Sequence, residues 1–437
     1  MKRPVALGLV TVLAGTALLG LPRMAEWIGS GRLQPAENGR VSGPAVAGGQ
    51  PLQGLIYMAV GIPEEETLDS ELRLRTETLL QGFGRSFRDL HPGVHLQLLT
   101  FPEPELVEQI QRRQQAGLAP DLLLVNAGTA LELESRGLAR SIQPSPALRN
   151  QIEPDVLARV RLGNGRLAGL PLLQQPELAC FNRTRLPQGS PANLDQLLRL
   201  SATGVRFGLS VEPLRLFWTV GGLGAGEALL RANRGLPLSS AERQRLTRWL
   251  SWLQNASFQQ QISFHANQEE LLTELKAGRL DWISCRSSSL NRLRSHLKAA
   301  LGVAPLPGGP AGQATPINRE RVLALGMNSS TNQRRIALEL ARFSVNPLVQ
   351  RKLTMHSLDV LPVNRFVPAP VASSSVLESM VRSAEAAEQA NPLVLELMGN
   401  RAALPALATI LSRVIFSEID PGSGTKELIE ALRPESR

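Results

Sequence analysis

Apolar and polar residues follow one another along this chain in blocks that have the lengths of helices and strands. Where apolar positions recur every three or four residues, the pattern predicts helices. The clearest ranges are 72–90, 103–116, 241–253, 269–275, 331–343 and 376–389. Short apolar runs bounded by turn residues predict strands, as in residues 54–60 and in the run LLLV after Asp121. The alternation of both kinds of block predicts an α/β fold, with a mostly parallel sheet flanked by helices.

One stretch, residues 163–182, indicates how the chain is divided. It reads GNGRLAGLPLLQQPELACFN, in which a Gly/Asn turn leads into the apolar run LAGLPLL and a second apolar run, LACFN, follows Pro176. The proline breaks the pattern between the two runs, which indicates that one strand ends and the next begins in another lobe. A length of 437 residues is about twice that of a usual domain and also favours two lobes.

This stretch resembles the "GKLYGVP…YNKDL" crossover of bacterial extracellular solute-binding proteins of the maltodextrin-binding type, the periplasmic sugar receptors of ABC importers. Further segments are similar to that family in the same order, among them PDLLLV, SRGLARSIQP, ELKAGRLDWISC and the run from ALELARF to LPVNR. The likeness covers roughly residues 54–432. It implies a two-lobe periplasmic binding protein of type II, with the ligand cleft between two discontinuous lobes.

The resemblance also implies where the lobes begin and end. Residues 51–174 and 303–345 are expected to form the N-terminal lobe, and residues 175–302 and 346–437 the C-terminal lobe. The chain would then cross between the lobes near Gln175, Val303 and Asn346, and these crossings would form a hinge.

The first residues of the chain predict that the protein is exported from the cytoplasm. Lys2 and Arg3 precede an uncharged run from Pro4 to Leu21, which is typical of an export signal. No clear small-x-small cleavage site follows, and the run is near the lower limit of a membrane span. Residues 1–28 are therefore interpreted as a signal peptide or an N-terminal anchor in the inner membrane, and residues 29–50 as a flexible linker to a periplasmic protein.

Composition and cysteine content exclude several classes of protein. The net charge is +9, but the arginines are scattered and aromatic residues make up only 4%, so nucleic-acid binding is not expected. Cys180 lies within an apolar strand pattern and is interpreted as a small buried hydrophobic residue, with a disulfide to Cys285 as the alternative. Two isolated cysteines cannot form a thiolate zinc site.

No pattern predicts catalysis, a metal site or a cofactor. His91 and His95 flank a Pro-Gly turn without a partner ligand, and Ser287 lies in a serine run without the GxSxG elbow of hydrolases. The glycines of residues 221–226 have no acidic residue on a following strand at the distance that a dinucleotide site needs.

Candidate ligand-binding residues follow from the rule that ligands of open α/β sheets lie beyond the carboxyl ends of the strands. That rule selects Glu64 after the first strand, for which a solvated helix start is the alternative. It also selects residues of the turn after LLLV and of the crossover, which are Asn126, Gly128, Thr129, Gln174 and Gln175.

The resemblance adds four candidates in the second lobe. SVEPLRLFW is similar to the family's "QEPYFTW" loop, which implies Glu212 as a hydrogen-bonding group and Trp218 as an aromatic platform. A core position for Trp218 is the equal alternative. Arg286 and Ser287 end the DWISC strand, where the family often has a sugar-facing tryptophan.

These features together predict a monomeric receptor that closes around a carbohydrate-like solute and delivers it to an ABC permease. Because stacking residues are few, a disaccharide, a glucosylated polyol or a sugar phosphate is expected, and Arg286 could meet the anion of the last. Two alternatives remain, which are an extracytoplasmic glycoside hydrolase and a membrane-tethered sensor or scaffold with a degenerate cleft.

Overall fold

The structure is a computed structural model that describes residues 51–63, 70–388, 390–400 and 403–433. The chain divides into two units, residues 1–50 and residues 51–437, and the fold is that of the second unit. The predicted signal or anchor, the linker and the candidate residue Glu64 lie outside the described residues. No helix in the described ranges combines the length and the apolar character that crossing a membrane requires.

The first of two sheets has seven described strands in the order β12-β5-β11-β3-β1-β2, with β4 paired to β11. Strand β1 pairs in parallel with β2 and β3, whereas β11 runs antiparallel to β3, β4 and β5. The bounds are β1 Gln53–Ile62, β2 Gly93–Pro102, β3 Leu122–Asn126, β4 Ala139–Arg140, β5 Leu170–Gln175, β11 Arg319–Gly326 and β12 Leu361–Pro362.

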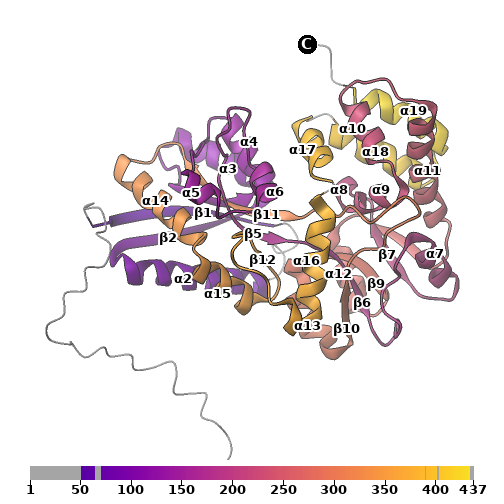
Figure 1. Cartoon of the computed structure of the whole chain (residues 1–437), viewed down its shortest axis with the longest axis horizontal. Helices are drawn as coiled ribbons and strands as arrows, with labels where there is room; N and C mark the ends of the chain where they lie inside the picture. Colours follow the sequence, from indigo (N-terminus) through magenta and orange to yellow (C-terminus); the bar gives the residue numbers. More distant parts are fainter. Residues whose placement is uncertain (1–50, 64–69, 389, 401–402, 434–437) are drawn as a thin grey trace, which may run out of the picture. The chain divides into compact units, whose positions relative to one another are not determined.

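Helices cover both faces of this sheet, with α3 and α4 on one side and α2 and α15 on the other (Figure 1). Their apolar faces form one core with the strands, in which Ile56, Leu106 and Ile336 are completely buried. The helix bounds are α2 Ser70–Leu90, α3 Glu103–Gln115, α4 Ala127–Ser135, α5 Pro146–Arg149, α6 Pro154–Ala158, α14 Thr331–Ser344 and α15 Pro347–Ser357.

The second sheet has five described strands in the order β10-β6-β9-β7-β8. Strand β7 is parallel to β8 and β9, and β6 is antiparallel to β9 and β10. Helices pack on both of its faces and extend beyond it. The strand bounds are β6 Glu177–Asn182, β7 Phe207–Ser210, β8 Ile262–His265, β9 Trp282–Arg286 and β10 Leu301–Ala304.

The helices of this second part are numerous and mostly short. Helix α11 begins with a capping box between its N-cap residue Ser239 and Glu242 of its first turn, and α16 packs against β6 and β10. The bounds are α7 Leu194–Ala202, α8 Pro213–Leu216, α9 Trp218–Leu223, α10 Gly226–Asn233, α11 Ser240–Ser257, α12 Gln268–Lys276, η1 Ser287–Ser289, α13 Leu290–Leu297, η2 Lys298–Ala300, η3 Val371–Ser373, α16 Ser375–Glu388, α17 Asn391–Gly399, α18 Ala403–Ile415 and α19 Pro421–Ala431.

The predicted α/β class with two discontinuous lobes is confirmed, but the first sheet is mixed instead of mostly parallel. The reason lies in β11, which arrives from the second sheet and enters the first from the opposite end. Its antiparallel pairing with β3, β4 and β5 follows from that direction of entry.

Strand pairing also locates the crossings between the sheets. The first falls at Pro176, between the end of β5 and the start of β6. Strand β10 still pairs with β6, so the return comes after Ala304 and not at Val303. Strand β12 pairs with β5, so the chain stays with the first sheet beyond residue 346. Both later boundaries differ from the expected ones because hydrogen bonding to a distant strand, and not the local pattern, decides to which sheet a short strand belongs.

The two cysteines form a disulfide, which corrects the interpretation of Cys180 as a free buried thiol. In the antiparallel pair of β6 and β9, Cys180 faces Ile283 and Cys285 faces Leu178, and the two cysteine Cα atoms are 5.8 Å apart. Both side chains are completely buried. Because 105 residues separate the two cysteines in the chain, the sequence alone could not show that their strands pair in this register.

Candidate ligand-binding pocket

A cavity of about 590 Å³ is lined by residues that follow strands of both sheets. From the first sheet come Pro63 after β1, Glu103 after β2 and Asn126 at the end of β3. From the second come Glu212, which follows β7, and Arg286, which ends β9. The volume lies within the range of small-molecule sites. The strand ends thus meet at one cavity, as expected for an open α/β protein.

Five of the described candidate residues line this cavity, namely Asn126, Gly128, Thr129, Glu212 and Arg286. Asn126 is the N-cap residue of α4, and Gly128 and Thr129 belong to the first turn of that helix. Glu212 precedes α8, and its side chain is 39% exposed and lies 3.4 Å from Nε of Arg215. Their roles in binding remain a proposal.

The other four described candidates do not line it. Gln174 lines a neighbouring cavity of about 450 Å³. The backbone carbonyl of Gln175 accepts a hydrogen bond from Arg286, and the hydroxyl of Ser287 donates to the carbonyl of Asp359 at 2.6 Å. Trp218 is completely buried, with its ring centroid 6.0 Å from that of Trp282. Trp218 therefore occupies the core position that was its alternative interpretation, and no aromatic platform forms there.

A buried ion pair organises the cavity wall that belongs to the first sheet. The carboxylate of Glu103, 8% exposed, accepts from the backbone N–H of Asn126 at 2.8 Å and from Nη1 of Arg321 at 2.9 Å. The same Nη1 donates to Oδ1 of Asn126 at 2.8 Å. A Cβ on Gly61 would lie 2.0 Å from Glu103, so glycine is required there for this approach. Arg321 thereby holds Asn126 in position.

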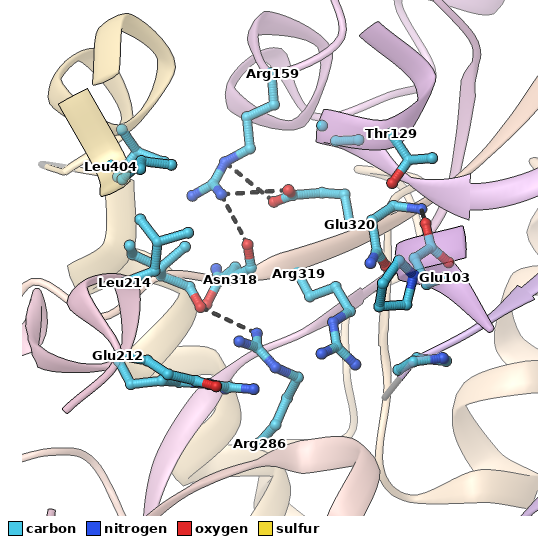
Figure 2. A pocket seen from close by; sticks show the side chains of 18 of the residues that line it. Glu103, Thr129, Arg159, Glu212, Leu214, Arg286, Asn318, Arg319, Glu320 and Leu404 are labelled. Carbon is cyan, nitrogen blue, oxygen red and sulfur yellow. Dashed lines mark hydrogen bonds and ion pairs between the residues drawn. The ribbon is translucent and has the colours of Figure 1, made fainter. Parts of the chain in front are cut away.

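A second buried pair lies where β11 begins. Nε of Arg159 lies 3.1 Å from Glu320, and Nη1 of Arg159 donates to the backbone carbonyl of Asn318 at 2.8 Å. Figure 2 shows this pair above the cavity. Burial raises the pKa of the Glu320 carboxyl, and the charges of Arg159 and Arg286 oppose that rise.

Arg286 joins the cavity to the crossings between the sheets. Its Nη1 donates to the carbonyl of Ile317 at 3.2 Å and, more weakly, to that of Gln175 at 3.4 Å. Behind it, burial raises the pKa of Glu177, and the charges of Arg215 and Arg286 oppose the rise. Contacts with Arg286 are therefore linked to the segments that connect the two sheets.

Aliphatic side chains supply the apolar part of the cavity. Val107 and Leu131 come from the first part, and Leu214, Leu395 and Leu404 from the second. Among the described residues that line the cavity, none is aromatic. The described cavity lining thus offers a ligand branched aliphatic surfaces instead of flat aromatic ones.

Sequence reasoning missed most of the charged residues and the apolar residue Leu404; the missed charged residues are Glu103, Glu132, Arg159, Arg215, Glu269, Arg319 and Glu320. One available signal was the run NRERVLALG, in which charged residues open an otherwise apolar strand and so mark a strand that starts at a polar site. The others come from helices whose position beside the cavity only the tertiary structure shows. Within the described ranges, no group of three His, Cys, Asp or Glu side chains could hold a metal ion.

Comparison with known proteins gives a family match. A family model described as bacterial extracellular solute-binding protein matches residues 84–377. No curated protein sequence matches the chain. Of the two comparisons made by sequence, the family model is thus the one that relates this chain to known proteins.

Several solved structures share the fold. The GacH receptor of Streptomyces glaucescens, solved unliganded and with acarbose, has a TM-score of 0.69 at 18% identity, covering 87% of this chain and 97% of that one. The maltodextrin-binding protein MalE1 of L. casei has a TM-score of 0.67 at 15% identity, covering 87% and 99%. MalE of Bdellovibrio bacteriovorus, bound to maltotriose, has a TM-score of 0.66 at 16% identity, covering 87% and 98%. At such identities the likeness establishes the two-lobe type II fold.

Proposed function

Since the chain belongs to the bacterial extracellular solute-binding proteins, we propose that it captures a carbohydrate-like solute and delivers it to the permease of an ABC importer. Membership of an extracellular family places the protein outside the cytoplasm. The solute would be a disaccharide, a glucosylated polyol or a sugar phosphate. The observation that carries the proposal is one cavity of about 590 Å³ that residues from both sheets line, with polar and aliphatic groups side by side.

The mechanism follows from the position of this cavity. A ligand that contacts Asn126 on one side and Glu212 on the other interacts with both parts only when they are close together. Its binding therefore stabilises the closed arrangement by differential contacts, and that arrangement would be recognised by the permease. The crossings at Pro176, between Ala304 and Arg319 and between Pro362 and Ser375 would act as the hinge.

The lining carboxylates favour binding over bond cleavage. Glu103, Glu132, Glu212, Glu269 and Glu320 each lie between 2.6 and 3.4 Å from an arginine nitrogen. A glycoside hydrolase needs two carboxyl groups at one cleft, of which one protonates the leaving group and the other acts as nucleophile or as the base that activates water. Arginine pairing suits carboxylates that support structure or orient a ligand, which supports a binding role over hydrolysis.

A thermal-shift screen of the purified protein against sugars, polyols and sugar phosphates tests the proposal. A ligand at 100 times its dissociation constant should add about 2.7 kcal/mol to the free energy of unfolding. Small-angle scattering with the best ligand should show a smaller radius of gyration. The proposal fails if no compound of these classes stabilises the protein, or if incubation converts the bound sugar into a product.

A further inference from the structure

Leucine side chains from three helices form an apolar wall of the cavity. Leu214 of α8, Leu395 of α17 and Leu404 of α18 line it, and all three are partly exposed. Figure 2 shows Leu214 and Leu404 on one side of the cavity and Glu103 and Thr129 on the other. Because the three leucines keep accessible surface instead of being enclosed by the protein, this leucine wall is available for a ligand to cover.

Core packing holds the helices of the leucine wall in position. Helix α18 contacts both α8 and α17, and buried residues of all three helices belong to one core cluster, among them Leu216, Leu397 and Leu407. The first part of the protein adds apolar side chains to the same cavity, from Val107 of α3 and Leu131 of α4. An apolar group in the cavity can therefore contact both parts and favour their closed arrangement.

The glutamates of the described lining are all in ion pairs. Each carboxylate lies between 2.6 and 3.4 Å from an arginine nitrogen, in the pairs Glu103–Arg321, Glu132–Arg136, Glu212–Arg215, Glu269–Arg292 and Glu320–Arg159. Pairing balances the charge of a carboxylate but leaves oxygen lone pairs that can accept hydrogen bonds from hydroxyl groups. The polar part of the lining thus suits an uncharged, hydroxylated group and does not require a charged one.

The shape of the leucine wall differs from that of a surface for a bare sugar ring. A sugar ring packs best on the flat face of an aromatic side chain, and the described part of the lining has no aromatic ring. Branched aliphatic side chains pack instead around methylene and methyl groups, and each such group that leaves water there adds affinity. A bare sugar would place hydroxyl groups on the leucine wall, where they would lose water without gaining a hydrogen-bond partner.

We infer that the natural ligand is an uncharged glycoside with an aliphatic aglycone. The aglycone lies on the leucine wall, and the hydroxylated part contacts the polar lining around Asn126 and Glu212. This inference rests on the proposed function and adds an aliphatic group to the sugar or polyol body that the function requires. The cavity then recognises two chemically different ends of one molecule, each by the kind of side chain that suits it.

Two series of glycosides test the inference by titration calorimetry on the purified protein: methyl, butyl and hexyl β-D-glucoside, and the matching maltosides. In at least one series the affinity should rise about two- to fourfold per methylene, so that the hexyl member binds at least about tenfold more tightly than the methyl member. The heat-capacity change of binding should become more negative along that series, because it marks the burial of apolar surface. Hexan-1-ol, which is the chain without the sugar, should bind at least about tenfold more weakly than the hexyl glycoside, because it lacks the hydroxylated part.

The double variant Leu395→Gln, Leu404→Gln should bring the hexyl-to-methyl affinity ratio below about threefold and leave the affinity for the methyl glycoside within about twofold. Both side chains are partly exposed, so folding should be retained. Leu404→Gln alone is the milder variant and should lower the ratio by at least about twofold. The matched control is Leu118→Gln, Leu348→Gln, because these leucines are 65% and 79% exposed and do not line the cavity. The control makes the same chemical change and should keep the ratio of the parent.

The outcomes separate this inference from the proposed function. If affinity does not rise with chain length in either series, or if the leucine variants keep the ratio of the parent, the aliphatic group is not recognised, and the inference is overturned while the function stands. If none of these glycosides binds, the inference is also overturned, and any saccharide that binds in the thermal-shift screen keeps the function. If that screen finds no saccharide either, both are overturned.

Discussion

The carboxylate of Glu177 accepts a hydrogen bond from the backbone N–H of Ile317 at 3.3 Å. Glu177 begins β6, directly after the first crossing, and Ile317 lies two residues before β11, at the end of the second. Two of the three segments that connect the sheets are thus tied to each other by a completely buried carboxyl group. Arg286, which lines the cavity, donates to the carbonyl of the same Ile317. The cavity lining and the crossings therefore share one polar cluster.

Glu177→Gln should change how stability depends on pH. Burial raises the folded-state pKa of Glu177 above its usual 4.5, so the folded protein holds this proton more tightly than the unfolded chain does. Its contribution to stability is therefore present below about pH 4.5 and is lost as pH rises through the folded pKa. Glutamine keeps the acceptor for Ile317 without titrating, so the variant should gain stability relative to the parent as pH rises above 4.5 through the folded-state pKa of Glu177. Urea unfolding at several pH values measures this difference, and parallel profiles would contradict it.

Asp281→Asn should change the pH dependence of stability in the opposite direction. Although burial raises the pKa of Asp281, hydrogen bonds from Arg206 outweigh it and lower the pKa below its usual 3.8. The contribution of Asp281 is then present above about pH 3.8 and is lost as pH falls through the lowered pKa. At pH 7 the variant should be less stable by about 1–3 kcal/mol, since Arg206 is partly exposed and solvent screens the pair. Acid unfolding should also become less steep; an unchanged acid midpoint would count against the pairing.

Glu212→Ala should weaken ligand binding and leave folding nearly intact. The Glu212 side chain is 39% exposed at the cavity, so its loss should cost less than about 1 kcal/mol of stability. A charged hydrogen bond to a ligand hydroxyl is worth about 1.5–3 kcal/mol, which corresponds to a loss of affinity of roughly 10–100-fold. Glu108→Ala is the control, because Glu108 is an exposed partner of Arg112 on α3 that does not line the cavity. Unchanged affinity in Glu212→Ala would remove Glu212 from the site.

Trp218→Phe should lower stability without changing affinity. Trp218 is completely buried among aromatic residues, with its ring centroid 6.5 Å from that of Trp252 and 6.0 Å from that of Trp282. Loss of packed ring volume should cost about 1–3 kcal/mol, and Trp218→Ala about 3–5 kcal/mol. Affinity measured on the folded fraction should stay within about twofold. A loss of affinity greater than about fivefold in a folded variant would instead indicate that Trp218 stacks on the ligand as an aromatic platform.

Removing the disulfide between Cys180 and Cys285 should destabilise the protein. The bond closes a loop with a sequence separation of 105 residues, and a loop of that size is worth up to about 4.7 kcal/mol of unfolded-state entropy. We expect a loss of about 2–4 kcal/mol in the double variant Cys180→Ala, Cys285→Ala, as measured by urea unfolding. Reduction of the unfolded parent before refolding should give the same loss; equal stability of parent and variant would contradict the prediction.

The helices and the α/β class could be predicted because their signals are local. Each predicted helix from 72–90 to 376–389 corresponds to an observed one, since an amphipathic face shows its period within a few turns. The first crossing at Pro176 was visible for the same reason, as a proline between two apolar runs breaks a strand whatever surrounds it.

What the sequence by itself determined was therefore the order and kind of elements, the division into two parts and the strand ends that line the cavity, among them those with Asn126, Glu212 and Arg286. Only the tertiary structure decided that Cys180 meets Cys285, that Trp218 is core, that the chain returns to the first sheet after Ala304, and that Arg319 comes from the first sheet to the same cavity as Arg286. Each of these depends on contacts between residues far apart in the chain, and their free energy leaves no periodic trace in the local pattern of apolar and polar residues.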